Sequence, residues 1–237
     1  MQRYFSSKKD NNYLYLNNDD IYHIKTVMRY NNGDCIEIVY DNKVYIASII
    51  DINNDIKFKI IETLDSNYKK IPNVTLIIPY LKEAKMDLIF QKATEMGISS
   101  FIIVPMERSI IKIDDKKIDA KLTRWMKICR EASEQSKRIT IPNIKIFNYF
   151  DELKFLDGHN FTCSTQEKAN NIKKVLKNVK ICDKINLVIG PEGGISPKEE
   201  QYLKNIGFIS VSLGDLIMRV ESVPLFLMSI INYEFME

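Results

Sequence analysis

The sequence predicts a two-part α/β protein, with a small β-rich domain over residues 1–70 and a mostly parallel α/β domain over residues 73–237. Apolar residues in the first part recur in short β-rich runs. In the second part, apolar strands alternate with amphipathic helices, which is typical of a parallel sheet. Between the two parts, Asp65–Pro72 is polar and ends in proline, so it is the expected linker.

In the first domain we expect one short helix, over Asp19–Tyr30. Three strands are expected after it, over Cys35–Tyr40, Val44–Ile50 and Ile56–Ile61. Asp41-Asn42 separates the first two strands and predicts a tight hairpin turn between them. Gly33-Asp34 turns the chain from the helix back into the sheet. Several short strands in so few residues predict a small barrel or sandwich.

The second domain contains strands expected at Val74–Pro79, Ser100–Val104, Asn160–Ser164, Ile185–Ile189 and Ile209–Ser212, and helices expected at Lys82–Met96, Asp115–Ser136, Ala169–Asn178, Pro197–Ile206 and Pro224–Phe235. The first helix carries Met86, Ile89 and Ala93 at the spacing of one apolar face. The inward row expected on the second helix is Ile118, Leu122, Met126, Cys129 and Ala132 or Ser133.

The composition excludes several classes of protein. Lys and Arg number 34 against 31 Asp and Glu, a net charge of +3, which is too weak for a protein that coats nucleic acid nonspecifically. The four cysteines have no zinc-binding spacing, and so we expect no metal site and no disulfide framework. No apolar run reaches the roughly 18 residues that cross a bilayer, and residues 1–12 lack a signal-peptide core. We therefore expect a cytoplasmic protein with no membrane association.

A glycine-rich loop, Gly190-Pro-Glu-Gly-Gly194, follows the apolar strand that ends at Ile189. In parallel α/β sheets, ligands bind at such loops beyond the carboxyl ends of strands. Ser196-Pro197 then begins a helix with a capping box. The loop matches neither the dinucleotide-binding fingerprint nor the P-loop, so nucleotide binding of those kinds is not supported. An ordinary glycine-rich turn is the alternative interpretation.

A second loop, Leu213–Pro224, places Arg219 and Glu221 just before the last expected helix, with Ser222 as its expected N-cap. Charged residues on a loop at a helix start suit recognition or proton handling. The alternative is an exposed ion pair of little consequence.

These two loops and four further motifs resemble one known family. The further motifs are Arg3-Tyr-Phe with His23 and Met28-Arg29, Lys92-Ala-Thr-Glu-Met-Gly97, Glu107-Arg-Ser109, and Glu131-Ala-Ser-Glu-Gln-Ser-Lys-Arg138. Together they resemble the 16S ribosomal RNA uracil-N3 methyltransferase family, which belongs to the knotted SPOUT methyltransferases. The chain departs from that family at Val223, where alanine is usual, and at Ile195, where phenylalanine is common.

The resemblance implies a fold and an activity. The fold is a small PUA-like β-barrel that binds RNA, followed by a SPOUT parallel-sheet methyltransferase domain with a trefoil knot. The activity is transfer of a methyl group from S-adenosyl-L-methionine to N3 of a uridine in the 16S rRNA of the small ribosomal subunit. The resemblance further implies a homodimer.

The resemblance also implies roles for particular residues. Arg219 and Glu221 are the catalytic candidates: Glu221 accepts the N3 proton and Arg219 stabilises the developing charge, or the roles are exchanged or relayed by water. The expected cofactor contacts are Ser164, Thr165, Gly190, Glu192, Gly193, Gly194, Leu213, Gly214, Ile217 and Met218. The expected RNA contacts are Arg3, His23, Arg29, Lys92, Arg108 and Arg138.

Three other functions stay open from the sequence. One is another SPOUT RNA methyltransferase that modifies a ribose hydroxyl or a tRNA base. The second is a noncatalytic RNA-binding ribosome-assembly protein. The third, a nucleotide-dependent α/β enzyme, is disfavoured by the loop sequences.

Overall fold

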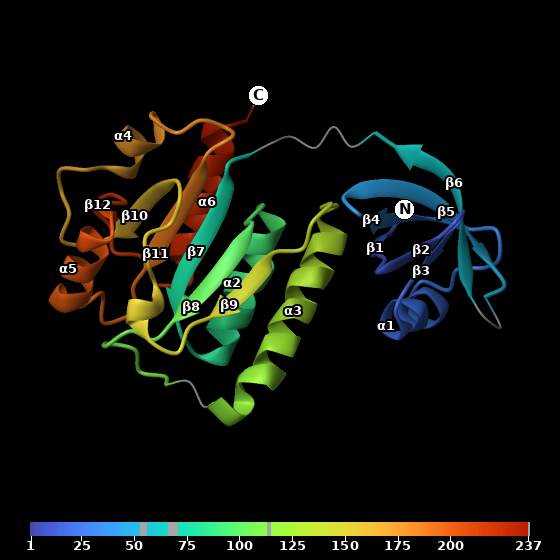
Figure 1. Ribbon diagram of the computed structural model, residues 1–237, viewed down its shortest axis with the longest axis horizontal. Helices are drawn as coiled ribbons and strands as arrows, with labels where there is room; N and C mark the ends of the chain where they lie inside the picture. Colours follow the sequence, from blue (N-terminus) through green and yellow to red (C-terminus); the bar gives the residue numbers. More distant parts are fainter. Residues whose placement is uncertain (53–55, 66–70, 113–114, 237) are drawn as a thin grey trace. The chain divides into compact units, whose positions relative to one another are not determined.

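The computed structural model describes residues 1–52, 56–65, 71–112 and 115–236 (Figure 1). The chain divides into two compact units, one formed by Met1–Lys69 with Ser133–Thr140 and the other by Lys70–Ala132 with Ile141–Glu237. The first unit therefore includes a segment from the middle of the chain, which the sequence did not indicate. Most of the expected linker, residues 66–70, lies outside the described residues.

The first unit is built on one sheet. Among the described residues its strands are β1 (Arg3–Phe5), β2 (Lys8–Asp10), β3 (Tyr13–Tyr15), β4 (Cys35–Tyr40), β5 (Lys43–Ile50) and β6 (Lys57–Leu64), in the order β1-β4-β5-β6-β3-β2. The β1–β4 pair is parallel and the others are antiparallel. The predicted hairpin is confirmed, because Tyr40 pairs with Lys43 and both turn residues have positive φ angles, 48° at Asp41 and 57° at Asn42.

The expected helix of the first unit is two shorter segments, α1 (Asn18–Tyr22) and the π-helical η1 (His23–Val27). Asn17 caps α1 by accepting a hydrogen bond from the Asp20 amide at 2.8 Å. Ile24 is fully buried in a core with residues of the sheet, among them Leu14 and Phe58. The helical part ends before Arg29, whose φ of 54° is incompatible with a continuing helix.

The second unit contains the expected parallel sheet. Among the described residues its strands are β7 (Asn73–Pro79), β8 (Ser100–Val104), β9 (Asn143–Ile146), β10 (His159–Cys163), β11 (Lys184–Ile189) and β12 (Ile209–Val211), in the order β12-β10-β11-β7-β8-β9. Every pairing between these strands is parallel. β9 was not expected from the sequence, because its pattern Asn-Ile-Lys-Ile is short and follows Pro142.

Helices cover both faces of this sheet (Figure 1). They are α2 (Glu83–Glu95), α3 (Ile118–Gln135), α4 (Ile172–Leu176), α5 (Pro197–Asn205) and α6 (Ser222–Glu234), with the short 3-10 turns η2 (Asp115–Lys117) and η3 (Phe150–Glu152). On β7, Leu76 and Ile78 share a core with α2, α3, α4 and α6, whereas Ile77 packs in a second core with α5. This alternation explains why β7 is apolar from Leu76 to its end: each of its faces is buried there.

The inward row predicted on α3 was wrong at Met126. That side chain is 52% exposed, whereas Trp125 is 1% exposed. Trp125 contacts Phe90 and Tyr80, with ring centroids 5.1 and 5.7 Å apart. Burying the large indole against two aromatic rings outweighs burying a methionine, so the helix turns its Trp125 side inward.

Two helix boundaries also differ from the predictions. α4 is shorter than Ala169–Asn178, because Asn171 caps it and Glu167 accepts hydrogen bonds from the Ala169 and Asn170 amides in the preceding turn. Ser222 is the first residue of α6 and not its N-cap, a position that Glu221 occupies with helical φ and ψ angles. Within the described part of the chain, none of the helices is long and apolar enough to span a membrane.

Candidate functional site

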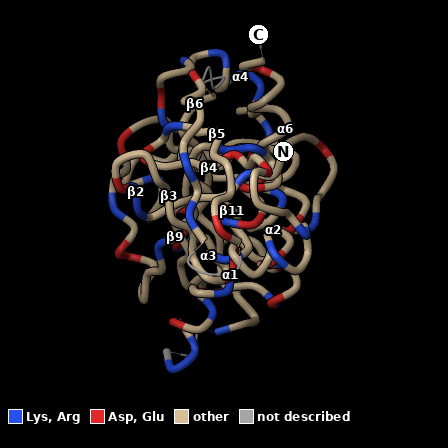
Figure 2. Tube along the Cα trace, turned by 90° about the vertical axis from the view of Figure 1, so that its right-hand side faces the viewer, with Lys and Arg blue, Asp and Glu red and all other residues tan. Residues whose placement is uncertain are grey.

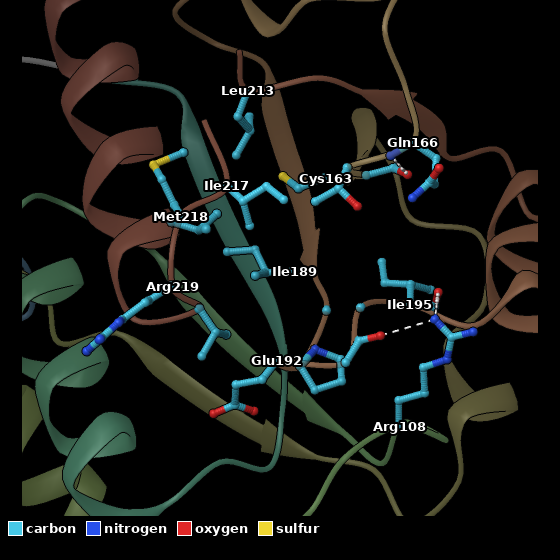
Figure 3. Close-up of a pocket in the computed structure, with 18 of the residues that line it drawn as sticks. Arg108, Cys163, Gln166, Ile189, Glu192, Ile195, Leu213, Ile217, Met218 and Arg219 are labelled. Carbon is cyan, nitrogen blue, oxygen red and sulfur yellow. Dashed lines mark hydrogen bonds between the residues drawn. The ribbon is translucent and has the colours of Figure 1, made fainter. Parts of the chain in front are cut away.

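A cavity of about 710 Å³ opens at the carboxyl ends of β10, β11 and β12 (Figure 3). Its walls come from the loops that follow these three strands. The ten residues expected to contact a cofactor all line it: Ser164, Thr165, Gly190, Glu192, Gly193, Gly194, Leu213, Gly214, Ile217 and Met218. Residues as far apart in the chain as Ser164 and Met218 are thus brought to one place, at the edge of the sheet where parallel α/β proteins bind ligands.

The loop after β11 is compact, and its first residue has to be glycine. A Cβ atom on Gly190 would lie 2.7 Å from Cγ1 of Ile195 and 3.0 Å from the Ile195 amide nitrogen. The loop is closed by a hydrogen bond of 2.8 Å from the Gly194 amide to the Pro191 carbonyl. This close approach leaves the Gly190 backbone bare toward the cavity, where a ligand can reach it.

The predicted capping box at the start of α5 is confirmed. Ser196 Oγ accepts from the Glu199 amide at 3.3 Å, and Glu199 Oε2 accepts from the Ser196 amide at 2.9 Å. Glu199 also accepts from the Glu107 amide at 2.7 Å through its other oxygen. The buried carboxylate therefore joins the start of α5 to the segment that follows β8.

Arg108 holds the glycine-rich loop from the segment after β8. Its guanidinium donates to the Gly193 carbonyl at 3.1 Å and to the Ile195 carbonyl at 3.5 Å (Figure 3). The family resemblance implied that Arg108 contacts RNA, and nothing in the surrounding sequence indicated that it lines the cavity. Its side chain is nevertheless exposed, so it both supports the loop and faces solvent.

One wall of the cavity is apolar and the opposite wall is polar. Ile189, Leu213, Ile217 and Met218 supply apolar side chains (Figure 3). On the polar side, Ser164 Oγ donates to Glu200 at 2.8 Å and accepts from the Gln166 amide at 3.2 Å. Gln166 and Glu200 were not among the predicted site residues, since neither stands in one of the recognised motifs. The two positions that depart from the family pattern, Ile195 and Val223, are both buried and both line the cavity.

The loop after β12 is open to solvent. Gly214 adopts a φ of 113°, which only glycine tolerates readily. Beyond it, Leu216 and Ile217 are 86% and 85% exposed, although both line the cavity. Apolar side chains at the mouth of a cavity can cover a ligand that enters it.

Cys163 lines the same cavity and is not a nucleophile there. Loss of water around this partly buried thiol raises its pKa to about 12. The thiol is therefore protonated at neutral pH, and only a thiolate attacks effectively.

Arg219 and Glu221, the two catalytic candidates, stand at the edge of the cavity nearest α2. Arg219 lines the cavity and extends to the same side as the carboxylate of Glu192 (Figure 3). Glu221 does not line the cavity; its carboxylate forms an ion pair with Lys85 of α2 at 3.0 Å. Lys85 also pairs with Glu192 at 2.7 Å. The sequence did not indicate Lys85, because its two partners lie far away along the chain.

The two carboxylates that pair with Lys85 have shifted pKa values. Burial alone would raise the pKa of Glu221, but hydrogen bonds from its own amide and from Lys85 hold that pKa below the ordinary value. The hydrogen bond from Lys85 likewise lowers the pKa of Glu192. Both carboxylates are therefore ionised at neutral pH.

Two of the six residues expected to contact RNA have little access to solvent. Arg3 and Arg138 are buried: Arg3 donates to Glu37 at 2.8 Å, and Arg138 donates to the Thr140 carbonyl at 3.2 Å. The Arg3 guanidinium also donates to the backbone carbonyls of Lys137 and Arg138. The Arg3 side chain therefore attaches residues 133–140 to the first unit. Basic and acidic residues are interspersed along the described part of the chain (Figure 2).

The other expected RNA contacts are more accessible. Arg29 is exposed, and His23 is half-buried, with its Nδ1 atom 2.9 Å from the Tyr4 hydroxyl. Lys92 is half-exposed and pairs with Glu95 of the same helix at 2.9 Å. Together with Arg108, these residues stay predicted RNA contacts.

Comparisons with known proteins agree with this architecture. A family model described as the RNA methyltransferase domain matches residues 68–232, and one described as the RNA methyltransferase PUA domain matches residues 16–62. The ribosomal RNA small subunit methyltransferase E of Mesomycoplasma hyopneumoniae is 32% identical over 97% of this chain and 98% of its own length. The protein of the same name from Bacillus subtilis is 29% identical over 91% of this chain and 88% of its own.

A similar fold occurs in a solved structure. The ribosomal RNA small subunit methyltransferase E from Neisseria gonorrhoeae, solved bound to S-adenosyl methionine, superposes with a TM-score of 0.85. The match covers 99% of this chain and 98% of the other, at 24% identity. At this identity the similarity shows that the fold is shared.

Proposed function

Because the chain belongs to the ribosomal RNA small subunit methyltransferase E family of RNA methyltransferases, we propose that it methylates N3 of a specific uridine in 16S rRNA, using S-adenosylmethionine. One observation carries the proposal: the ten residues that the family resemblance marks as cofactor contacts line a single cavity. That cavity lies at the carboxyl ends of parallel strands, where this class of sheet binds its ligands.

The cavity fits S-adenosylmethionine in size and chemistry. Its volume, about 710 Å³, lies within the range typical of small-molecule sites. Leu213 and Ile217 would contact the apolar face of the adenine, and backbone groups at Gly190 and Gly214 would meet its polar atoms. When bound, the cofactor supplies a methyl group on a sulfonium centre, so the protein has to align that methyl with its acceptor.

The protein also has to manage one proton. N3 of uracil carries a proton, and this nitrogen attacks the methyl group well only after the proton has been removed. We assign proton acceptance to Glu221, which is ionised at neutral pH, and stabilisation of the negative charge on the base oxygens to Arg219. Because Glu221 does not line the cavity, we assign the transfer of the proton to a water molecule between the base and Glu221.

The base assignment has its own test. Replacing Glu221 with glutamine keeps the shape and removes the negative charge, and we expect methyl transfer at pH 7 to fall about 100-fold or more. Binding of S-adenosylmethionine, measured by calorimetry, should change little because Glu221 does not line the cavity. A Glu221→Gln variant with full turnover at neutral pH would remove the assignment.

Further family properties belong to the same proposal. We infer that the first unit contacts RNA through His23 and Arg29, and that Lys92 and Arg108 of the second unit also contact RNA. We further infer that the enzyme acts on the small ribosomal subunit in the cytoplasm. A homodimer and a trefoil knot in the methyltransferase domain are proposed on family resemblance alone. Light scattering of the purified protein tests the homodimer.

The decisive experiment is methyl transfer from labelled cofactor into small subunits, and into naked 16S rRNA, from a strain that lacks the enzyme. Mass spectrometry of the product should identify one N3-methyluridine. A methylated ribose, or label in tRNA alone, would indicate another RNA methyltransferase. RNA binding without any binding of S-adenosylmethionine would indicate a noncatalytic assembly protein.

A further inference from the structure

Lys85 connects three segments that are far apart in the sequence. It lies in the first turn of α2, and its ammonium is 2.7 Å from Glu192 Oε1 and 3.0 Å from Glu221 Oε2. Glu192 belongs to the loop after β11 that lines the cavity, and Glu221 occupies the N-cap position of α6. One cation therefore joins a helix to both loops that contain the charged residues of the site.

The environment of Lys85 differs from that of an ordinary surface ion pair. Only 25% of its side chain is exposed, and the side chain of Glu221 is 17% exposed. The first turn of a helix disfavours a positive charge, so the position of Lys85 is explained by its two acidic partners. An ion pair between Lys85 and one carboxylate would be common on a protein surface. Here one ammonium is shared by two carboxylates, and it fixes the distance between them.

We propose that Lys85 is a positioning residue for methyl transfer, because it holds the carboxylates of Glu192 and Glu221 in one arrangement beside Arg219. This inference rests on the proposed function. Without the ammonium, two ionised carboxylates a few ångströms apart would repel each other and move the two loops apart. Glu192 would then shift within the cavity and Glu221 would leave its place near the methyl acceptor.

The charges that face Glu221 predict a pH effect as well. They are Lys85 from α2 and Arg219 from its own loop. Glu192, from the loop after β11, shares Lys85 with Glu221, and Lys82 acts on Glu192 from the N-cap of α2. Removal of Lys85 leaves Glu192 as an unneutralised neighbour, so the pKa of Glu221 should rise. The acid limb of the pH profile of kcat/KM should move to higher pH accordingly.

The test compares Lys85→Met and Lys85→Arg in the full chain. We expect Lys85→Met to lower kcat/KM for methyl transfer about 10- to 100-fold, mainly through kcat, since misplacement of reacting groups costs that much. Lys85→Arg keeps the charge and should retain most of the activity. Lys184→Met is the matched control, because Lys184 pairs with Asp157 at 2.9 Å on the surface and does not line the cavity.

A double variant makes the test independent of folding defects. If Lys85 acts by neutralising two carboxylates, Lys85→Met combined with Glu192→Gln should lose less activity than the product of the two single losses. The inference is overturned if the losses simply multiply, or if Lys85→Met keeps the wild-type kcat/KM and pH profile. Urea unfolding of the wild type, the two single variants and the double variant measures the Lys85–Glu192 interaction without an activity assay. A failure of this inference can therefore be distinguished from a failure of the proposed function.

Discussion

Gly190 gives the sharpest test of how closely the glycine-rich loop is packed. Replacing it with alanine adds a single methyl group, which would lie 2.7 Å from Cγ1 of Ile195, 3.0 Å from the Ile195 amide nitrogen and 3.1 Å from the Gly194 carbonyl carbon. Two of these three atoms belong to the backbone and cannot rotate away. The loop therefore has to move, and its cavity-lining conformation becomes a minor one.

The size of the effect follows from the strain. Forcing one extra methyl group into a well-packed site costs about 1–3 kcal/mol. If the loop relieves this strain by leaving its cavity-lining conformation, binding of S-adenosylmethionine weakens by about 5- to 150-fold. Removing Cγ1 with Ile195→Ala should recover part of the loss in the double variant, because only the two backbone contacts remain.

Titration calorimetry of Gly190→Ala, Ile195→Ala and the double variant measures these affinities. Urea unfolding of each variant reports whether the fold itself has been damaged. Wild-type affinity in Gly190→Ala would refute the close packing of the loop. A double variant as weak as Gly190→Ala alone would show that the Ile195 side chain is not the obstacle.

Two further predictions concern stability. Trp125→Ala should lower the free energy of unfolding by about 3–5 kcal/mol, whereas Met126→Ala, at a 52% exposed position, should change it by no more than about 0.5 kcal/mol. Urea midpoints measure both changes, and equal losses would contradict the orientation of α3. Burial alone would raise the pKa of Glu37, but hydrogen bonds from Lys137 and Arg3 lower it, so this carboxylate stabilises the fold above its unfolded pKa and stops doing so as the pH falls through its folded pKa. Glu37→Gln should therefore be less stable than the wild type at pH 7, with a difference that narrows below about pH 4.5; a constant difference would rule out the titration of Glu37 as its source.

The parallel sheet and the two loops beside the cavity were predictable from local signals, whereas the individual cofactor contacts came from the family resemblance. Strand β11 ends in the apolar run Leu187–Ile189, and the capping box at Ser196 marks the helix that follows it. Glycine at 190 and 214 marks backbone that no other residue would form as easily. A loop between such a strand and such a helix has one place to lie, the carboxyl edge of the sheet.

Other features depended on partners that are distant along the chain. Strands β1, β2 and β3 have three residues each, too few to display a period of two. The inward row of α3 allowed either Trp125 or Met126, and only packing against Phe90 decides between them. Lys85 looks like any helical lysine until Glu192, 107 residues away, is placed beside it.

The assignment of Ser133–Thr140 to the first unit has a consequence for how the protein is made. During translation, residues 1–69 leave the ribosome well before this segment does. Arg3 then lacks its acceptors on Lys137 and Arg138, and Glu37 lacks the ammonium of Lys137. The first unit consequently stays incomplete until about 140 residues have emerged, and a fragment cut at residue 69 lacks part of its own fold.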